Sequence, residues 1–188
     1  DGGFSDGLLE GSSISGWINL DKSVSQNFNV AFKLNNATTR FFEPFLTGIA
    51  SDLKGTFSTE VSIKGSLDEP KIEGFANFSR PKFTIDYLQT TYHADTIVVN
   101  ISNTLIRANP LTLYDQNDVP ANVYGYVTHK SFKNLKVNLR VDDMNKFLVL
   151  NTKEKDNELY FGSAFMTGYF KMSGPFDDLF MEVKGKTG

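Results

Sequence analysis

Apolar and polar residues alternate with a period of two along most of this 188-residue chain. Successive side chains of a β-strand point to opposite faces of a sheet, so this alternation predicts strands with one apolar and one polar face. The pattern is clearest in the segments 28–34, 57–63, 83–87, 135–141, 170–172 and 179–183. Segment 96–101 is rich in β-branched residues and predicts a further strand, but its two faces are less clear.

Clusters of Gly, Pro, Asn and Asp separate these segments and are typical of turns. They lie at 65–70, 115–118, 142–143, 155–157 and 173–175. No alternation of strands with helices is visible, which argues against a parallel α/β fold. The sequence therefore predicts an all-β, mainly antiparallel protein of about ten to twelve short strands in meander order.

One segment breaks the period of two. Apolar residues in 38–54 recur at spacings of three, four, seven and eight, which predicts one amphipathic helix over residues 37–54. Thr38 or Thr39 can cap its start, Gly55 can end it, and Pro44 would begin or kink the regular helix. Such a helix either packs in a core or covers an edge or open end of the sheet. Its predicted apolar face comprises Phe41, Phe42, Phe45, Leu46, Ile49 and Leu53.

We expect a single β-rich segment of a longer protein, since the chain begins with Asp1 and lacks an initiator Met. Its parts are N-terminal hairpins over 1–36, the helix over 37–54 and meandering strands over 55–188. The longest run without Asp, Glu, Lys or Arg is the 12-residue stretch Leu159–Phe170. A spanning helix needs roughly 20 apolar residues, so we expect none here, and the start shows no signal-peptide core.

The sequence offers little chemistry. A net charge of −3 argues against a nucleic-acid surface, and the absence of cysteine excludes a thiol nucleophile and a disulfide scaffold. His93 and His129 lack partners at metal-ligand spacing, and the acids at 115–118 are predicted to form a hairpin turn. No nucleophile elbow, phosphate loop or dinucleotide fingerprint occurs. The prediction is a protein that is not an enzyme and needs no cofactor or metal.

The apolar strand faces leave two architectures open. A closed sandwich or barrel buries such a face against itself, whereas an open, curled sheet keeps it available to acyl chains. Alternation alone does not separate the two possibilities.

A helix, a glycine, a strand and a Gly-Ser-Leu turn follow one another between residues 42 and 74. The turn continues as Gly65-Ser66-Leu67-Asp68-Glu69-Pro70-Lys71-Ile72-Glu73-Gly74. This order resembles the recurrent unit of TamB-type translocation and assembly module proteins of the AsmA-like superfamily. The stretches 150–152 and 157–162 resemble a stretch in the C-terminal part of the same family, and 168–179 repeats the unit with a shifted Pro. The likeness therefore covers roughly residues 40 to 188.

The resemblance implies a segment of a periplasmic envelope protein of Gram-negative bacteria, anchored in the inner membrane. Its fold would be a curled, taco-like open sheet with an apolar interior. The implied function is to carry phospholipid acyl chains between the inner and outer membranes. Implied partners are neighbouring segments of the same rod and, outside this segment, an outer-membrane barrel.

Under this hypothesis the apolar strand residues line the groove. The candidate lining residues are Phe28, Val30, Phe32, Leu34, Phe57, Val61, Ile63, Phe83, Ile85, Val98, Leu135, Val137, Leu139, Phe170 and Met172. A second hypothesis is a chaperone-like module that binds nascent β-strands of outer-membrane proteins by edge addition. A third, an enzyme or sugar-binding sandwich, requires clustered acids or an aromatic platform beside polar groups.

Overall fold

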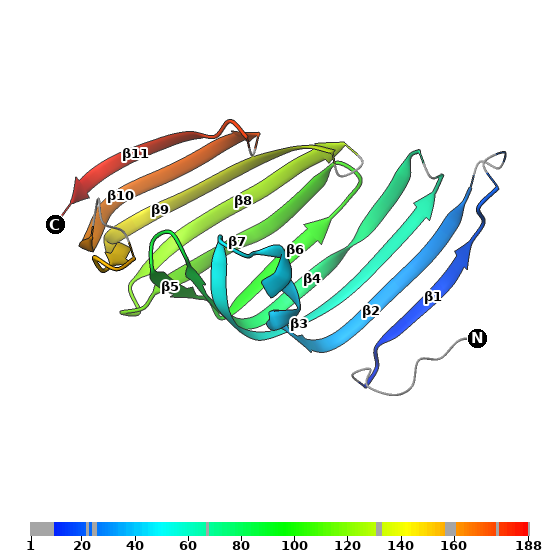
Figure 1. Cartoon of the computed structure of the whole chain (residues 1–188), viewed down its shortest axis with the longest axis horizontal. Helices are drawn as coiled ribbons and strands as arrows, with labels where there is room; N and C mark the ends of the chain where they lie inside the picture. Colours follow the sequence, from blue (N-terminus) through cyan, green and yellow to red (C-terminus); the bar gives the residue numbers. More distant parts are fainter. Residues whose placement is uncertain are drawn as a thin grey trace.

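The computed structural model describes residues 10–21, 23, 26–66, 68–130, 133–156, 161–175 and 177–187. These residues form one sheet of eleven strands and one short 3-10 helix, η1 (Thr39–Phe45) (Figure 1). The strands are β1 (Ser13–Ile18), β2 (Phe28–Thr38), β3 (Ala50–Gly65), β4 (Pro70–Ile85), β5 (Thr90–His93), β6 (Thr96–Ile101), β7 (Leu105–Asp115), β8 (Pro120–Lys130), β9 (Lys133–Thr152), β10 (Gly162–Pro175) and β11 (Phe180–Thr187).

Every strand pair is antiparallel, and the order across the sheet follows the sequence from β1 to β11. β5 and β6 both pair with β4 and β7, and only residues 94–95 separate them. They are therefore two halves of one interrupted strand. The predicted all-β antiparallel meander is confirmed, and among the described strands β1 and β11 are the edges.

The helix predicted over 37–54 is wrong in length and type. η1 spans only Thr39–Phe45, and β3 already begins at Ala50. Pro44 lies inside η1 and donates no hydrogen bond, and Gly48 adopts a φ of +77° in the turn that follows. Residues 50–54 instead satisfy their backbone groups against 82–85 of β4. Thr38 does cap the helix, since its side chain accepts a hydrogen bond from the Arg40 amide.

The register places most of the apolar strand residues on one face. Directly opposed residues of neighbouring antiparallel strands share a face, and residues two apart along a strand do too. Two rows of such partners cross the sheet. The first is Ile14, Phe32, Val61, Gly74, Ile101, Ile106, Val127, Val137 and Gly174; the second is Leu34, Thr59, Ala76, Val99, Ala108, Gly125, Leu139, Met172 and Met181. We call the side that carries both rows the apolar face.

The opposite side is the polar face. Its rows contain Lys64 opposite Glu73 and Lys171 opposite Glu182, and each pair is an ion pair, with N–O distances of 3.9 and 3.6 Å. Exposed ion pairs of this kind contribute little to stability, and their charges keep the polar face hydrated. The sheet is thus amphipathic across its whole width.

The sheet folds onto itself at one end. Two strands, β7 and β8, separate β5 from β9 in the sheet order, yet the rings of Tyr92 and Phe147 stack at 5.5 Å. The Asn151 amide donates to the Leu88 carbonyl across the same gap, at 2.9 Å. We call this region the closed end. Its buried residues are Tyr92, Ala121, Met144, Phe147 and Met166, flanked by Phe83, Ile85, Leu113, Val119, Val141, Val149 and Phe170.

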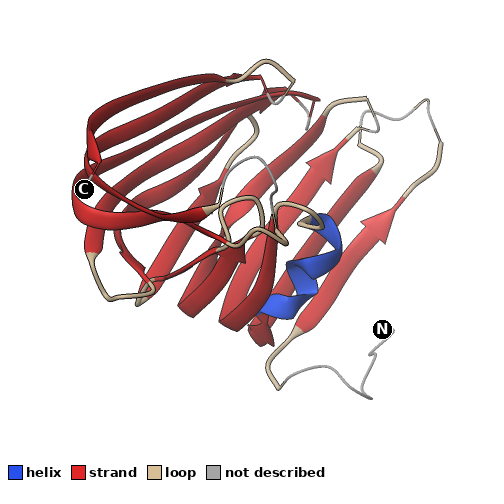
Figure 2. Cartoon of the chain, turned by 60° about the vertical axis from the view of Figure 1, so that its left-hand side comes forward, coloured by secondary structure: helices blue, strands red, loops and turns tan. Residues whose placement is uncertain are grey.

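Elsewhere the described residues form a single layer, and none of them covers the apolar face beside η1 (Figure 2). Val30, Ile63, Ile106 and Val127 are only half-buried, although they sit among apolar neighbours. The chain exposes 12556 Å², whereas a compact monomer of its 21.0 kDa would expose about 9,000 Å². The excess fits a thin sheet better than a compact globule.

Candidate functional site

The apolar face is the candidate site, and it contains all the predicted lining residues except Val98. They differ in how far they are covered. Phe57 is only 3% exposed because η1 packs over it, and Phe83, Ile85 and Phe170 belong to the closed end. Leu135, by contrast, is exposed. The half-buried remainder lies on the open part of the face; these residues are Phe28, Val30, Phe32, Leu34, Val61, Ile63, Val137, Leu139 and Met172.

The prediction for Val98 is wrong. Val98 lies opposite Asn77 on the polar face, and its neighbours Ile97 and Val99 point to the apolar face opposite Phe78 and Ala76. Four β-branched residues in succession, Thr96 to Val99, give no alternation, so the sequence alone left this strand without a defined inner side.

The sequence also missed much of the apolar face on β4, β7 and β8. Ile72, Ile106 and Val127 lie in the rows or beside them. Their alternation is interrupted by Pro110, by glycine, and by the bulge between Ala108 and Leu111. The available signal was the repeated spacing of two on each side of these interruptions.

η1 lies on the apolar face rather than at a sheet edge (Figure 2). The centroid of the Phe42 ring lies 4.9 Å from that of Phe57 and 5.8 Å from that of Phe78. On the outer side, Phe41 and Phe45 are 57% and 73% exposed. η1 is therefore apolar towards both the sheet and the solvent.

The predicted helix face is thus divided among three elements. Phe41, Phe42 and Phe45 lie in η1, Leu46 and Ile49 in the turn that follows it, and Leu53 in β3. Leu53 is buried, whereas Ile49 is 59% exposed.

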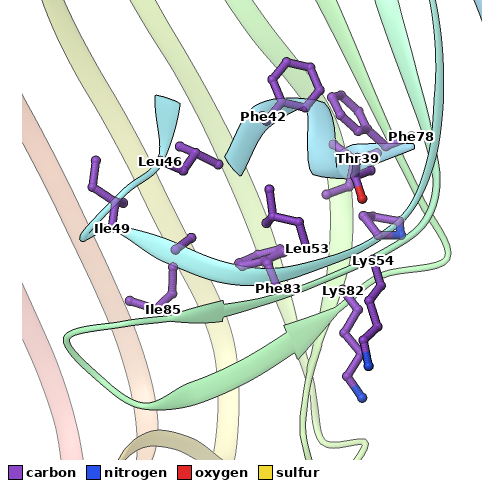
Figure 3. Close-up of a pocket in the computed structure, with 13 residues that line it drawn as sticks. Thr39, Phe42, Leu46, Ile49, Leu53, Lys54, Phe78, Lys82, Phe83 and Ile85 are labelled. Atoms are coloured by element: carbon purple, nitrogen blue, oxygen red, sulfur yellow. The ribbon is translucent and has the colours of Figure 1, made fainter. Parts of the chain in front are cut away.

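A cavity of about 440 Å³ lies between η1, the turn after it and the sheet (Figure 3). Its exposed wall is apolar. Figure 3 shows Leu53 and Phe83 on its sheet side, whereas the long side chains of Lys54 and Lys82 run away from it. The lining residues are Thr39, Phe42, Leu46, Ile49, Ala50, Leu53, Lys54, Phe78, Pro81, Lys82, Phe83, Ile85 and Ile97.

A fully buried carboxylate, Asp115, organises the closed end. Its Oδ1 accepts hydrogen bonds from the amides of Asn117 and Val119, at 2.8 and 3.0 Å. Its Oδ2 accepts one from the Leu148 amide of β9, at 2.7 Å. The predicted hairpin turn at 115–118 is confirmed, because the Asp118 amide donates to the Asp115 carbonyl at 3.0 Å. The side chain of Asp115 thus joins this turn to β9.

Asp115→Ala should lower the free energy of unfolding by about 3 kcal/mol, since the Leu148 amide would be buried without an acceptor. Asp115→Asn keeps one carbonyl oxygen and should cost less. Urea unfolding at pH 7 measures both. Asp118→Asn is the control, because that side chain is 85% exposed and Asn also tolerates the φ of +62° at this position, so the change should have little effect. A near-wild-type midpoint for Asp115→Ala would contradict the assigned role.

The second polar group of the closed end is the Tyr92 hydroxyl, which donates to the Leu148 carbonyl at 3.1 Å. Burial, assisted by the charge of Asp115, outweighs a hydrogen bond with Thr90 and raises the pKa of Tyr92 from 10.0 to about 12. A raised pKa means that folding favours the neutral phenol. The corresponding stability is complete below pH 10 and is lost as the pH rises towards 12.

The wild type should therefore lose about 2 to 3 kcal/mol between pH 10 and 12 relative to Tyr92→Phe. Urea unfolding of both proteins across this range gives the difference directly. Tyr124→Phe, which removes the hydroxyl of a 44% exposed ring, is the control for the substitution itself. Parallel pH profiles for wild type and Tyr92→Phe would refute burial as the cause of the shift.

The described residues contain no group of three or more His, Cys, Asp and Glu placed to hold a metal ion. Among the same residues, no helix has the length and apolar character to span a membrane. His93 stacks on Tyr114 and lies 3.3 Å from Asp118, and buried His129 contacts the Ser102 carbonyl.

The fold and face define an amphipathic, single-layer antiparallel sheet that is closed at one end. No family model, curated protein or solved structure matches the chain. The resemblance to TamB-type proteins therefore stays a prediction.

Proposed function

We propose that the protein is a non-enzymatic lipid-binding segment whose apolar face carries phospholipid acyl chains. The observation that supports this most is the continuity of the two apolar rows, which cross the sheet from β1 or β2 to β10 or β11 without a charged side chain. A large exposed apolar patch generally marks a site of interaction with another apolar surface.

Acyl chains suit this face because they need contact without directed hydrogen bonds. Burying one methylene group contributes about 0.8 kcal/mol, so a dozen half-covered groups would contribute about 5 kcal/mol. A binding surface of this kind holds a lipid without fixing its position along the strand rows. That property is the one required of a carrier along which lipids move.

The cellular setting follows from the resemblance and belongs to the same proposal. The segment would work in the periplasm of a Gram-negative bacterium, within an inner-membrane-anchored protein that moves phospholipid towards the outer membrane. Neighbouring segments of the same rod would pair with the edge strands β1 and β11. A partner barrel in the outer membrane would bind the full-length protein outside this segment.

Photo-crosslinking in cells tests the proposal. A photoreactive amino acid at Phe32, Ile63 or Leu139 should form phospholipid adducts, because all three lie on the apolar face. The same group at Lys33 or Arg140, on the polar face, is the control. Absence of adducts at all three apolar positions would overturn the proposal.

A second candidate function is the capture of nascent β-strands. It is favoured by the two edges, since β1 pairs only with β2 and β11 only with β10 among the described strands. Such edges can add a strand through backbone hydrogen bonds. Proline substitutions in β1 and β11 would abolish peptide capture and leave lipid adducts on the apolar face intact. Peptide capture that survives these substitutions would contradict this second candidate function.

A further inference from the structure

We propose that the cavity beneath η1 is a holding site for the end of one acyl chain, distinct from the open rows of the apolar face. The inference rests on the proposed function and adds a defined position to it. Lipids on the open rows could slide, whereas a chain end that enters the cavity would be held between η1 and the sheet.

The wall of the cavity selects for hydrocarbon. The side chains that face it include Leu46, Leu53 and Phe83, and the ammonium groups of Lys54 and Lys82 point away from it (Figure 3). The cavity is open to solvent on one side, but its apolar wall offers water no hydrogen-bond partner, so an apolar guest displaces that water favourably. A hydrocarbon chain meets this requirement, and a headgroup does not.

The size fits the end of a chain. About 440 Å³ falls within the range of roughly 300–1,000 Å³ that small-molecule pockets occupy. A methylene group takes up about as much space as a water molecule, roughly 30 Å³, so about a dozen methylene groups can enter. One acyl chain therefore fills the cavity, and a second chain does not fit beside it.

The chain connection that forms the cavity is unusually long for neighbouring antiparallel strands. Residues 39–49 join β2 to β3, although two to five residues are common for such hairpins. These extra residues fold back over the apolar face and present apolar groups on both sides, with Phe42 against the sheet and Phe45 outward. A lipid lying along the open face would meet the outer apolar side of η1 before its chain reached the cavity.

The test uses the complete chain and two probes, palmitic acid and phosphatidylethanolamine vesicles, each carrying a diazirine near the end of an acyl chain. Peptides that contain Leu46, Leu53 or Phe83 should be labelled. Labelling by the phospholipid identifies it as the source of the chain, and labelling by palmitic acid alone identifies a free fatty acid. Either result supports an acyl-chain site.

Ala50→Phe should fill the cavity and reduce this labelling by about tenfold. Ala31→Phe makes the same change on the polar face, opposite Ser62, and should leave the labelling unchanged. If Ala50→Phe does not fold by circular dichroism, Ile97→Phe takes its place. Two results would overturn this inference alone. In the first, peptides from the apolar rows are labelled but peptides from the cavity are not. In the second, labelling of the cavity peptides persists in the variant whose cavity is filled. No labelling anywhere would overturn the proposed function as well.

Discussion

Val99→Asp should weaken phospholipid binding by about 100-fold, because its carboxylate would lie within the second apolar row between Ala76 and Ala108. An ionised carboxylate in hydrocarbon costs about 3 kcal/mol, and the acyl chains on this face would offer it no partner. The measurement is retention of fluorescent phospholipid by the purified chain. Circular dichroism of the same sample establishes that the sheet is intact.

Its neighbour provides a matched control. Val98→Asp introduces the same group one position earlier, on the polar face opposite Asn77. Val98 and Val99 are both half-buried, so the two variants differ chiefly in the face that receives the charge. Lipid retention should be close to that of the wild type in Val98→Asp. Equal losses in the two variants would show that binding does not depend on the apolar face.

Gly55→Val should destabilise the chain by about 4 kcal/mol, which is at the high end for a single substitution. Gly55 has a φ of +101° where β3 bends beneath η1, and a Cβ there would lie 2.6 Å from the Arg80 carbonyl oxygen and 2.7 Å from that of Ser79. Both clashes are with the backbone of β4, which cannot move away without breaking the pairing. Thermal and urea unfolding measure the loss.

Gly48→Val is the matched control, because Gly48 also has a positive φ, +77°, but a Cβ there would have no neighbouring atom within 4 Å. It should cost only about 1 to 2 kcal/mol, the penalty of the left-handed conformation. A Gly55→Val protein as stable as Gly48→Val would mean that β3 does not bend at this position.

The strands were predictable because successive side chains of a strand point to alternate faces, which produces a local sequence pattern. Alternation in β2 and in the first half of β9 correctly placed Phe28 to Leu34 and Leu135 to Val141 on one face. The predicted turn at 115–118 was also correct, since Asp115 satisfies its own hairpin. These features depend on neighbours in sequence.

Features that depend on distant partners were not predictable. Residues 50–54 have helical spacing, but pairing with β4 determines their conformation. Asp142 and Asp143 were expected in a turn, yet they lie within β9, where Asp143 takes a φ of +58° beside a bulge. Tyr92 stacks on Phe147, which is far from it in the chain, so the local sequence pattern could not predict this contact.

If lipid contacts only the apolar face of the sheet, spin-label accessibility along β9 should alternate from one residue to the next. The chain contains no cysteine, so a single introduced cysteine carries the only nitroxide. The scan covers Leu135, Lys136, Val137, Asn138, Leu139 and Arg140 with phospholipid bound. Leu135, Val137 and Leu139 should become accessible to oxygen and protected from a polar nickel reagent, whereas the three alternate positions should stay open to nickel. Accessibility without this period of two would show that lipid does not bind to the apolar face alone.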